Sequence, residues 1–210
     1  MRKLTAIAAA LALMCSCAPK AETVDLFNGK DFEGWNFVVD GNADPSEVFS
    51  VEDGEIHITG SPFGYMYTEA TYSDFDLDVE WSWFDEPKNS GIFLLIAEPS
   101  NPFPNGIECQ LKAGSAGDFV LLGGSDLKEY VLPEDGVRPN FPKVLKMEES
   151  SEKPVGEWNH THIEVREGVI SVWINDVLQN RATDPVTSGH IGLQSEGGPV
   201  KFRTVRLTCR

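Results

Sequence analysis

The chain is short of positive charge. Its 210 residues include 17 lysines and arginines against 33 aspartates and glutamates, which gives a formal net charge of −16 at pH 7. Nucleic acids and anionic lipid headgroups are bound mainly through basic side chains, so neither is expected as a partner. Neutral sugars are not excluded, and the acidity also serves solubility.

Long apolar runs are scarce too, and the clearest is residues 4–14. This run follows Arg2 and Lys3 and is too short to span a bilayer, which is typical of a signal peptide. It ends in Met14-Cys15-Ser16-Cys17, and a small residue followed by Cys resembles a bacterial lipoprotein cleavage site. Cys17 is therefore the predicted lipid attachment residue, with an ordinary secretory signal as the alternative.

This leader sets the expected organisation of the chain. Residues 1–17 are the predicted signal peptide, residues 18–23 a tether, and residues 24–210 a single domain long enough for a sizeable core. We expect the protein in the bacterial cell envelope, touching the membrane only through its N-terminal lipid.

Cysteine is also rare. Only Cys109 and Cys209 remain after the leader, and their spacing fits no metal-binding motif. An exported protein can pair two such cysteines, but Cys109 alternates with apolar residues, where a buried thiol is equally natural. Both alternatives stay open at this point.

The chain has no sustained 3.6-residue repeat of apolar side chains, which would predict helices. Its apolar and polar residues alternate instead, which is typical of strands. Residues 74–84 place apolar and acidic side chains on opposite faces, and residues 91–97 are apolar on both. Turn signals such as Asp53-Gly54, Glu167-Gly168 and Asn175-Asp176 separate many short strands. We expect an all-β sandwich or jelly roll, with loops 98–105 and 133–154 near a binding site.

The most informative strand is residues 106–112. Alternation puts Glu108, Gln110 and Lys112 on one face, and Ile107, Cys109 and Leu111 on the other. A carboxylate, an amide and an ammonium group on one face fit a concave surface that grips a polar ligand such as a sugar. The alternative is an ordinary strand face on which Glu108 pairs with Lys112.

Several separated segments together resemble one known family. They are the opening at 26–35, Asp74-Phe-Asp-Leu77, Asn89-Ser-Gly-Ile-Phe93, Gly106-Ile-Glu-Cys-Gln110, Gly156-Glu-Trp-Asn-His160, Ile174-Asn175, and Gly189-His-Ile-Gly-Leu-Gln194 followed by residues 200–203. Their order and spacing are similar to those of the bacterial 3-keto-disaccharide hydrolase domain family, formerly a domain of unknown function, over residues 24–208. The chain departs from the family at Ser195-Glu196, where many members carry His, and at residues 114–124.

The resemblance implies a concanavalin-like jelly-roll β-sandwich of two antiparallel sheets that acts on oligosaccharides or other glycosides. In the implied reaction the sugar is already oxidised at C3, so a base removes the C2 proton, the C1 substituent leaves, and water adds. A separate sugar 3-oxidoreductase would supply the ketone. Two alternatives remain open: classical hydrolysis by two carboxylates, with Glu69 as the partner of Glu108, and a glycan-binding module without catalysis.

The resemblance also supplies candidate site residues. Glu108 is the candidate base, with Gln110 and His160 as further catalytic candidates and Asn89 as a substrate-binding candidate. The competing interpretations are a cross-strand hydrogen bond for Gln110 and a turn for Asn89. Independently of the resemblance, Tyr65, Tyr67 and Glu69, which precede the strand at 74, and Lys112 and Arg181 are candidates for substrate binding, since aromatic rings stack on sugars and cations stabilise an enolate oxygen. The alternatives are ordinary strand residues for the first three and exposed ion pairs for Lys112 and Arg181.

A cofactor is not certain from the sequence. His160, His162 and Glu164 share one strand face, an array that presents metal ligands in some proteins and solvated side chains in more. A divalent cation at the ketone is chemically attractive, but no compelling cage for one is visible.

Overall fold

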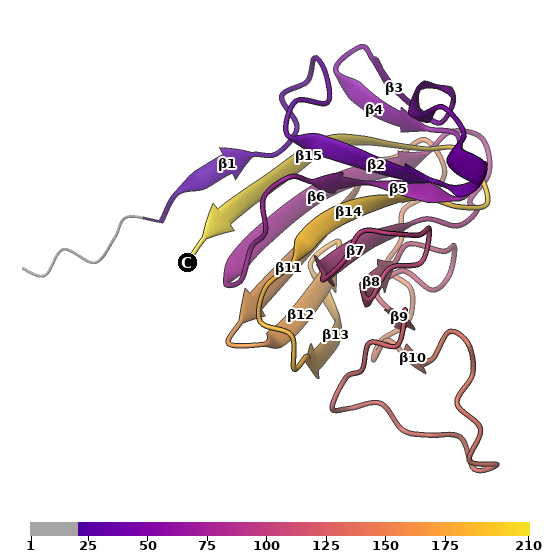
Figure 1. The fold of residues 1–210 in the computed structure, drawn as a ribbon, viewed down its shortest axis with the longest axis vertical. Coiled ribbons are helices and arrows are strands. Elements are labelled where there is room, and N and C mark those ends of the chain that lie inside the picture. Colours follow the sequence, from indigo (N-terminus) through magenta and orange to yellow (C-terminus); the bar gives the residue numbers. More distant parts are fainter. Residues whose placement is uncertain (1–20) are drawn as a thin grey trace, which may run out of the picture.

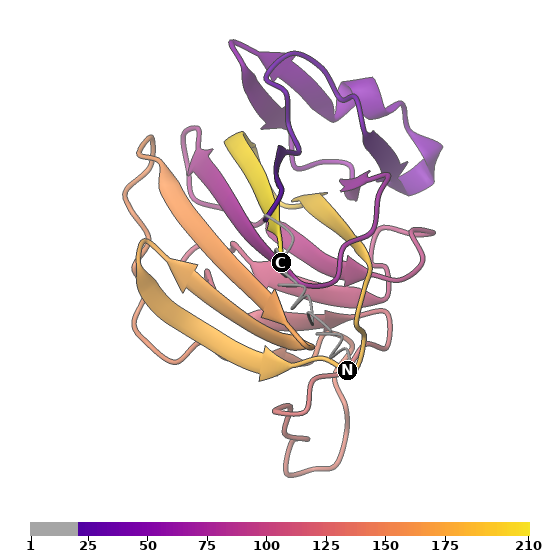
Figure 2. The same cartoon turned by 90° about the vertical axis from the view of Figure 1, so that its left-hand side faces the viewer.

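The computed structural model describes residues 21–210 and shows two antiparallel sheets packed face to face (Figures 1 and 2). The predicted signal peptide, Cys17 and the first half of the tether, residues 18–20, lie outside the described residues. Within residues 21–210, no helix is long and apolar enough to cross a membrane. The all-β jelly-roll prediction is confirmed, and the only helices in this range are two short 3-10 turns, Asp40–Asn42 and Pro45–Glu47.

We call the two layers sheet A and sheet B. Sheet A runs, in spatial order, β13 (Val177–Thr183), β12 (Val169–Ile174), β11 (Asn159–Arg166), β6 (Phe75–Trp83), β15 (Val200–Cys209), β4 (Glu55–Ile58) and β3 (Phe49–Glu52), with β1 (Thr23–Asp25) on part of β15. Sheet B runs β10 (Lys143–Val144), β9 (Phe119–Leu122), β8 (Gly106–Gln110), β7 (Gly91–Ile96), β14 (His190–Ser195), β5 (Gly64–Thr68) and β2 (Trp35–Val39).

The main core lies between the sheets. On β6, the alternate residues Phe75, Leu77, Val79, Trp81 and Trp83 all face this core, as the sequence predicts. The only polar atom of the buried Trp81 ring has a hydrogen-bond partner, because Nε1 donates to Thr161 Oγ1 at 2.9 Å.

The predicted hairpin turns have the backbone that such turns require. Asp53 and Gly54 join β3 to β4 with φ of 52° and 80°, and Asn175 and Asp176 join β12 to β13 with φ of 49° and 67°. Left-handed conformations at both central residues match the twist of the paired strands, which is why Asn, Asp and Gly are favoured there.

A second, smaller apolar cluster covers the outer face of sheet B. It contains Tyr65, Phe93, Ile96, Val120 and Leu122. This explains the doubly apolar run at 91–97, since Ile92 and Leu94 face the main core while Phe93 faces outward. The connection between β9 and β10 projects from one end of the sandwich, as both views show (Figures 1 and 2).

Both described cysteines are free thiols. Cys109 is buried in β8 of sheet B, whereas Cys209 is partly buried at the end of β15 in sheet A. Of the two alternatives, the structure therefore favours unpaired cysteines.

Candidate active site

Strand β8 directs Glu108 onto the outer face of sheet B. Ile107 and Cys109 point into the main core, so Gly106, Glu108 and Gln110 point outward. The residues directly opposite Glu108 are Phe93 on β7 and Val120 on β9, both of them apolar. Glu108 is only 3% exposed.

A cavity of about 210 Å³ opens beside this carboxyl group. It is lined by Asn89, Phe103, Glu108, Gln110, Lys112, Val120, Leu122, Phe141, Lys143 and Glu196. The structure thus brings together four residues singled out from the sequence, namely Glu108, Gln110, Lys112 and Asn89. The two predicted binding loops contribute as well, because Phe103 lies in the first and Phe141 and Lys143 lie in the second.

Unpartnered polar atoms gather on the same face. Among the described residues, eight buried side-chain oxygens or nitrogens have no hydrogen-bond partner, and four of them are Tyr65 Oη, Asn89 Oδ1, Glu108 Oε1 and Gln194 Oε1. Tyr65 and Gln194 are directly paired across β5 and β14. Asn89 and Glu108 line the cavity, whereas Tyr65 and Gln194 do not. Because leaving a buried polar group unpaired costs about 1–3 kcal/mol, the two unpaired oxygens at the cavity mark it as a candidate binding site for polar groups of a ligand.

The electrostatics of the cavity centre on two carboxyl groups. Burial, followed by the nearby charge of Glu196, raises the pKa of Glu108 to about 8, although Lys143 opposes the rise. Burial also raises the pKa of Glu196, but the amides of Gln194 and Asn89 and the ammonium groups of Lys112 and Lys143 favour its charged form. Perturbed carboxyl groups in a cavity are typical of catalytic sites.

Glu196 and Gln194 were not among the candidates from the sequence. Gln194 ends the Gly189–Gln194 motif, and its Nε2 donates to Glu196 Oε2 at 2.8 Å. The available signal was the alternation of strand 190–195, which places residues 194 and 196 on one face. Glu196 itself stood out only as a departure from the family pattern.

Three phenylalanines form a row, and two of them, Phe103 and Phe141, line the cavity. The ring centroids of Phe63 and Phe103 are 5.8 Å apart, and those of Phe103 and Phe141 are 5.2 Å apart. Phe63 and Phe141 are 44% and 47% exposed, so part of each ring faces solvent. The row offers an apolar platform next to the carboxyl groups.

Comparison with known proteins identifies the family. The model of the 3-keto-alpha-glucoside-1,2-lyase-like domain matches residues 22–208. The chain belongs to this family. The resemblance recognised from the motifs is thereby confirmed.

Relatives of the chain include proteins that act on or bind carbohydrates. A protein named 3-keto-disaccharide hydrolase, from Bacteroides thetaiotaomicron, is 24% identical over 88% of this chain and 77% of its own length. A candidate glycosyl hydrolase from Parabacteroides distasonis superimposes with a TM-score of 0.64 at 22% identity, covering 88% of this chain and 92% of that one. The carbohydrate-binding module CBM66 from Bacillus subtilis gives 0.60 at 16% identity, covering 82% and 94%. Structural likeness at such low identity supports the concanavalin-like fold alone.

The substrate-binding candidates chosen for their side-chain chemistry, apart from Lys112, lie outside the cavity. Tyr65 and Tyr67 share its sheet face, with ring centroids 5.8 Å apart, but do not line it. Glu69 is exposed beyond the end of β5, and Arg181 is exposed on β13 of sheet A. Neither is brought together with Glu108, so the pairing of Glu108 with Glu69 that classical hydrolysis required is not supported by their placement.

His160 lies on the opposite side of the molecule from Glu108. On β11, Ile163 and Val165 face the core, so His160, His162 and Glu164 point away from it on the outer face of sheet A. Nε2 of His160 and Nδ1 of His162 both lie within hydrogen-bond distance of Asp78 Oδ1, at 2.9 and 2.8 Å. The structure therefore does not bring His160 to the cavity, because the whole core separates the two faces.

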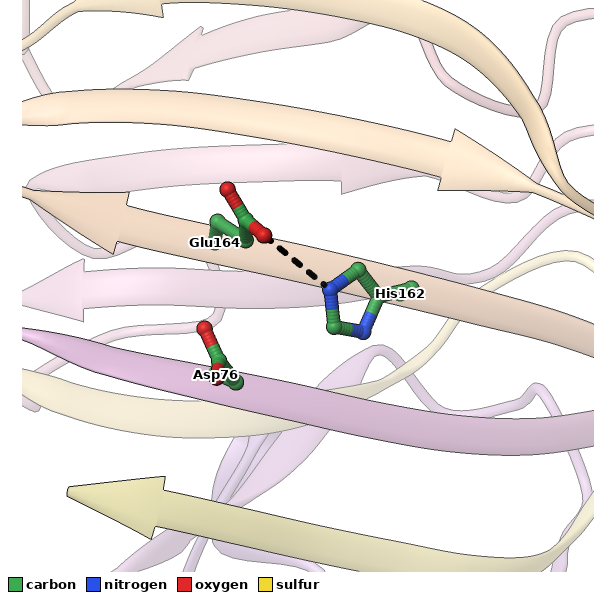
Figure 3. Close-up of side chains that lie close together, drawn as sticks. All are labelled: Asp76, His162 and Glu164. Carbon is green, nitrogen blue, oxygen red and sulfur yellow. Dashed lines mark ion pairs between the residues drawn. The ribbon is translucent and has the colours of Figure 1, made fainter. Parts of the chain in front are cut away.

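Figure 3 shows the side chains on this outer face whose donor atoms lie within 4.8 Å of one another, namely Asp76, His162 and Glu164. Nε2 of His162 is 3.6 Å from Glu164 Oε1. Asp76, however, already pairs with the guanidinium groups of Arg166 and Arg210. Two fixed positive charges at that carboxylate oppose the binding of a cation, so we assign no metal site here.

Proposed function

We propose that the protein is an enzyme that cleaves glycosides already oxidised at C3, by removal of the C2 proton, elimination of the C1 substituent and addition of water. Family membership supports action on glycosides, and the name of the Bacteroides relative supports the 3-keto substrate. The observation that carries the proposal is the buried, unpartnered carboxyl group of Glu108 at a cavity with a second carboxyl group, that of Glu196.

The chemistry of a 3-keto sugar fits these surroundings. The ketone makes the C2 proton acidic, so the enzyme needs a proton acceptor of suitable pKa and a donor for the developing enolate oxygen. The cavity supplies two carboxyl groups to fill these two roles, the amides of Gln110 and Asn89 for orientation, and Lys112 and Lys143 as positive charges.

A second candidate function is classical hydrolysis with two carboxyl groups flanking the glycosidic bond. The observation that favours it is the presence of Glu196 together with Glu108 in one cavity. The third candidate, a glycan-binding module, requires only the aromatic rim and the polar face.

One comparison of substrates separates the three. Purified protein is incubated with a 3-keto-disaccharide, with a 3-keto-glucoside and with the same sugars unoxidised, and the released sugar is measured. We expect release from the ketones alone. Release from the unoxidised sugars would favour classical hydrolysis, and binding without any turnover would favour the binding module.

We further propose that the protein is a lipoprotein of the bacterial cell envelope that works after a sugar 3-oxidoreductase. The support is the leader sequence ending at Cys17 and the need of the reaction for an oxidised substrate. Mass spectrometry of the mature N-terminus tests the anchor, and an unmodified N-terminus beyond Cys17 would exclude it.

A further inference from the structure

The two carboxyl groups of the cavity differ in how well they can carry a negative charge. No side-chain hydrogen bond to Glu108 is found among residues 21–210, its Oε1 is unpartnered, and its cross-strand neighbours are Phe93 and Val120. Glu196 is half-buried, and its Oε2 accepts a hydrogen bond from Gln194. A buried carboxylate without donors is costly, whereas one that accepts amide hydrogen bonds is stabilised.

When the two carboxyl groups together hold one proton, the negative charge therefore lies on Glu196. Two carboxylates at one small cavity repel each other, so the first proton to bind goes to the group with the poorer surroundings, which is Glu108. Burial and hydrogen bonding thus determine which of the two carboxyl groups holds the proton, and the raised pKa of Glu108 agrees with this assignment. A carboxylic acid kept neutral by an apolar site can donate a hydrogen bond to an enolate oxygen.

We propose that Glu108 is the neutral donor that holds the C3 ketone oxygen and that Glu196 is the base that removes the C2 proton. This assignment rests on the proposed function. It replaces the role of base that the resemblance suggested for Glu108, because sequence motifs and strand alternation do not report the hydrogen bonds around a side chain.

Glu196 carries every proton that moves in the proposed reaction. The Glu196 carboxylate takes the C2 proton, and the C–H electron pair forms C2=C3 while the ketone electrons move onto the oxygen held by Glu108. The electron pair on the enolate oxygen then re-forms the ketone, and the C2=C3 pair moves to form C1=C2. The bond from C1 to the glycosidic oxygen breaks, and that oxygen takes the proton from Glu196. Water then adds its oxygen to C1, Glu196 accepts the proton of that water, and the same proton passes to C2. Both carboxyl groups end as they began.

The assignment makes opposite predictions for two amide variants. In Glu108→Gln the amide still donates to the ketone oxygen, so proton abstraction should stay within about 10-fold of wild type. In Glu196→Gln the base is gone, so abstraction should fall by about 100-fold or more. Glu108→Leu removes the hydrogen-bond donor, so its rate of proton abstraction should be well below that of Glu108→Gln. Glu157→Gln, an exposed carboxyl group elsewhere, is the matched control.

Exchange of the C2 proton for solvent deuterium measures this step without bond cleavage. The probe is 3-keto-glucose in deuterated buffer, followed by proton NMR with each variant. A 100-fold loss of the exchange rate in Glu108→Gln overturns the assignment, regardless of the rate measured for Glu196→Gln. If wild type exchanges no proton of any 3-keto sugar, the proposed function itself fails.

An infrared measurement tests the location of the proton independently of activity. We expect a protonated-carboxyl band at pH 7 that persists in Glu196→Gln and disappears in Glu108→Gln. A band lost in Glu196→Gln instead, or absent from wild type, overturns the assignment even if the enzyme cleaves its substrate. Near-native circular dichroism of each variant confirms that the comparison concerns folded protein.

Discussion

The side chain of Glu108 occupies the space that Gly91 leaves open. A Cβ at position 91 would lie 2.6 Å from Glu108 Cγ and 2.7 Å from Oε1. Gly91 is directly opposite Gln110 on β8, so the carboxyl group leans across β7 over a residue without a side chain. Gly91 thus determines where the carboxyl group can point.

The variant Gly91→Ala should therefore displace the Glu108 carboxyl group while keeping the sandwich. We expect turnover of a 3-keto-glycoside to fall about 10-fold or more, because a displacement of about 1 Å is costly in an active site. The destabilisation, measured by urea unfolding, should be about 1–3 kcal/mol from overpacking. In a Glu108→Ala background the clashing atoms are absent, so the same change at position 91 should cost little. Equal costs in both backgrounds would contradict the relationship.

Stability should depend on pH through Glu108. Its pKa is raised from 4.5 to about 8 in the folded state, so the folded protein holds this proton while the unfolded chain has released it. The stabilising contribution is complete below about pH 4.5 and is lost as the pH rises through about 8, with a total of the order of 5 kcal/mol. Urea unfolding at pH 5 and pH 8.5 should show a much smaller decrease for Glu108→Gln than for wild type. Parallel decreases would argue that Glu108 ionises normally.

The aromatic rim should contribute to binding rather than to chemistry. Phe141→Ala and Phe103→Ala each remove part of the exposed platform, so we expect KM to rise about 5- to 30-fold, with kcat reduced less. Val137→Ala, at an apolar residue that is 64% exposed in the same long loop, is the control and should leave both constants unchanged. A change in kcat alone would place the rings in the chemical step instead.

The two described cysteines should react very differently with thiol reagents. Cys109 is fully buried, and burial raises the pKa of its thiol, so native protein should protect it. Cys209 is partly exposed and should be alkylated first. Peptide mass spectrometry after alkylation of native and of denatured protein, without reductant, measures both. Recovery of a peptide linked through Cys109 and Cys209 would contradict the free thiols.

Much of the fold was predictable because strand periodicity and turn chemistry are local. Alternation along residues 74–84 identified the core face of β6, and Asp53-Gly54 and Asn175-Asp176 marked true hairpins. The same periodicity placed Glu108 and Gln110 on one face of β8. The loop at 133–154 was predictable as a binding loop from its length and polarity, but not the contact of Phe141 with Phe103.

Local patterns did not decide which functional side chains meet. His160 alternates on its strand just as Glu108 does, yet the two lie on opposite outer faces of the molecule. Glu196 lies far from Glu108 in the sequence and reaches the same cavity only because β7 and β14 are neighbours in sheet B.

The sequence by itself determined the strands, their inward faces, the family and the presence of Glu108 on a polar face, since each depends on residues close together or on motif order. Only the tertiary structure decided what surrounds the Glu108 carboxyl group. Its surroundings are the space left by Gly91, the apolar neighbours Phe93 and Val120, and the second carboxyl group, that of Glu196. The physical reason is that the pairing of distant strands sets burial, hydrogen bonding and charge around a side chain, and these together set its chemistry.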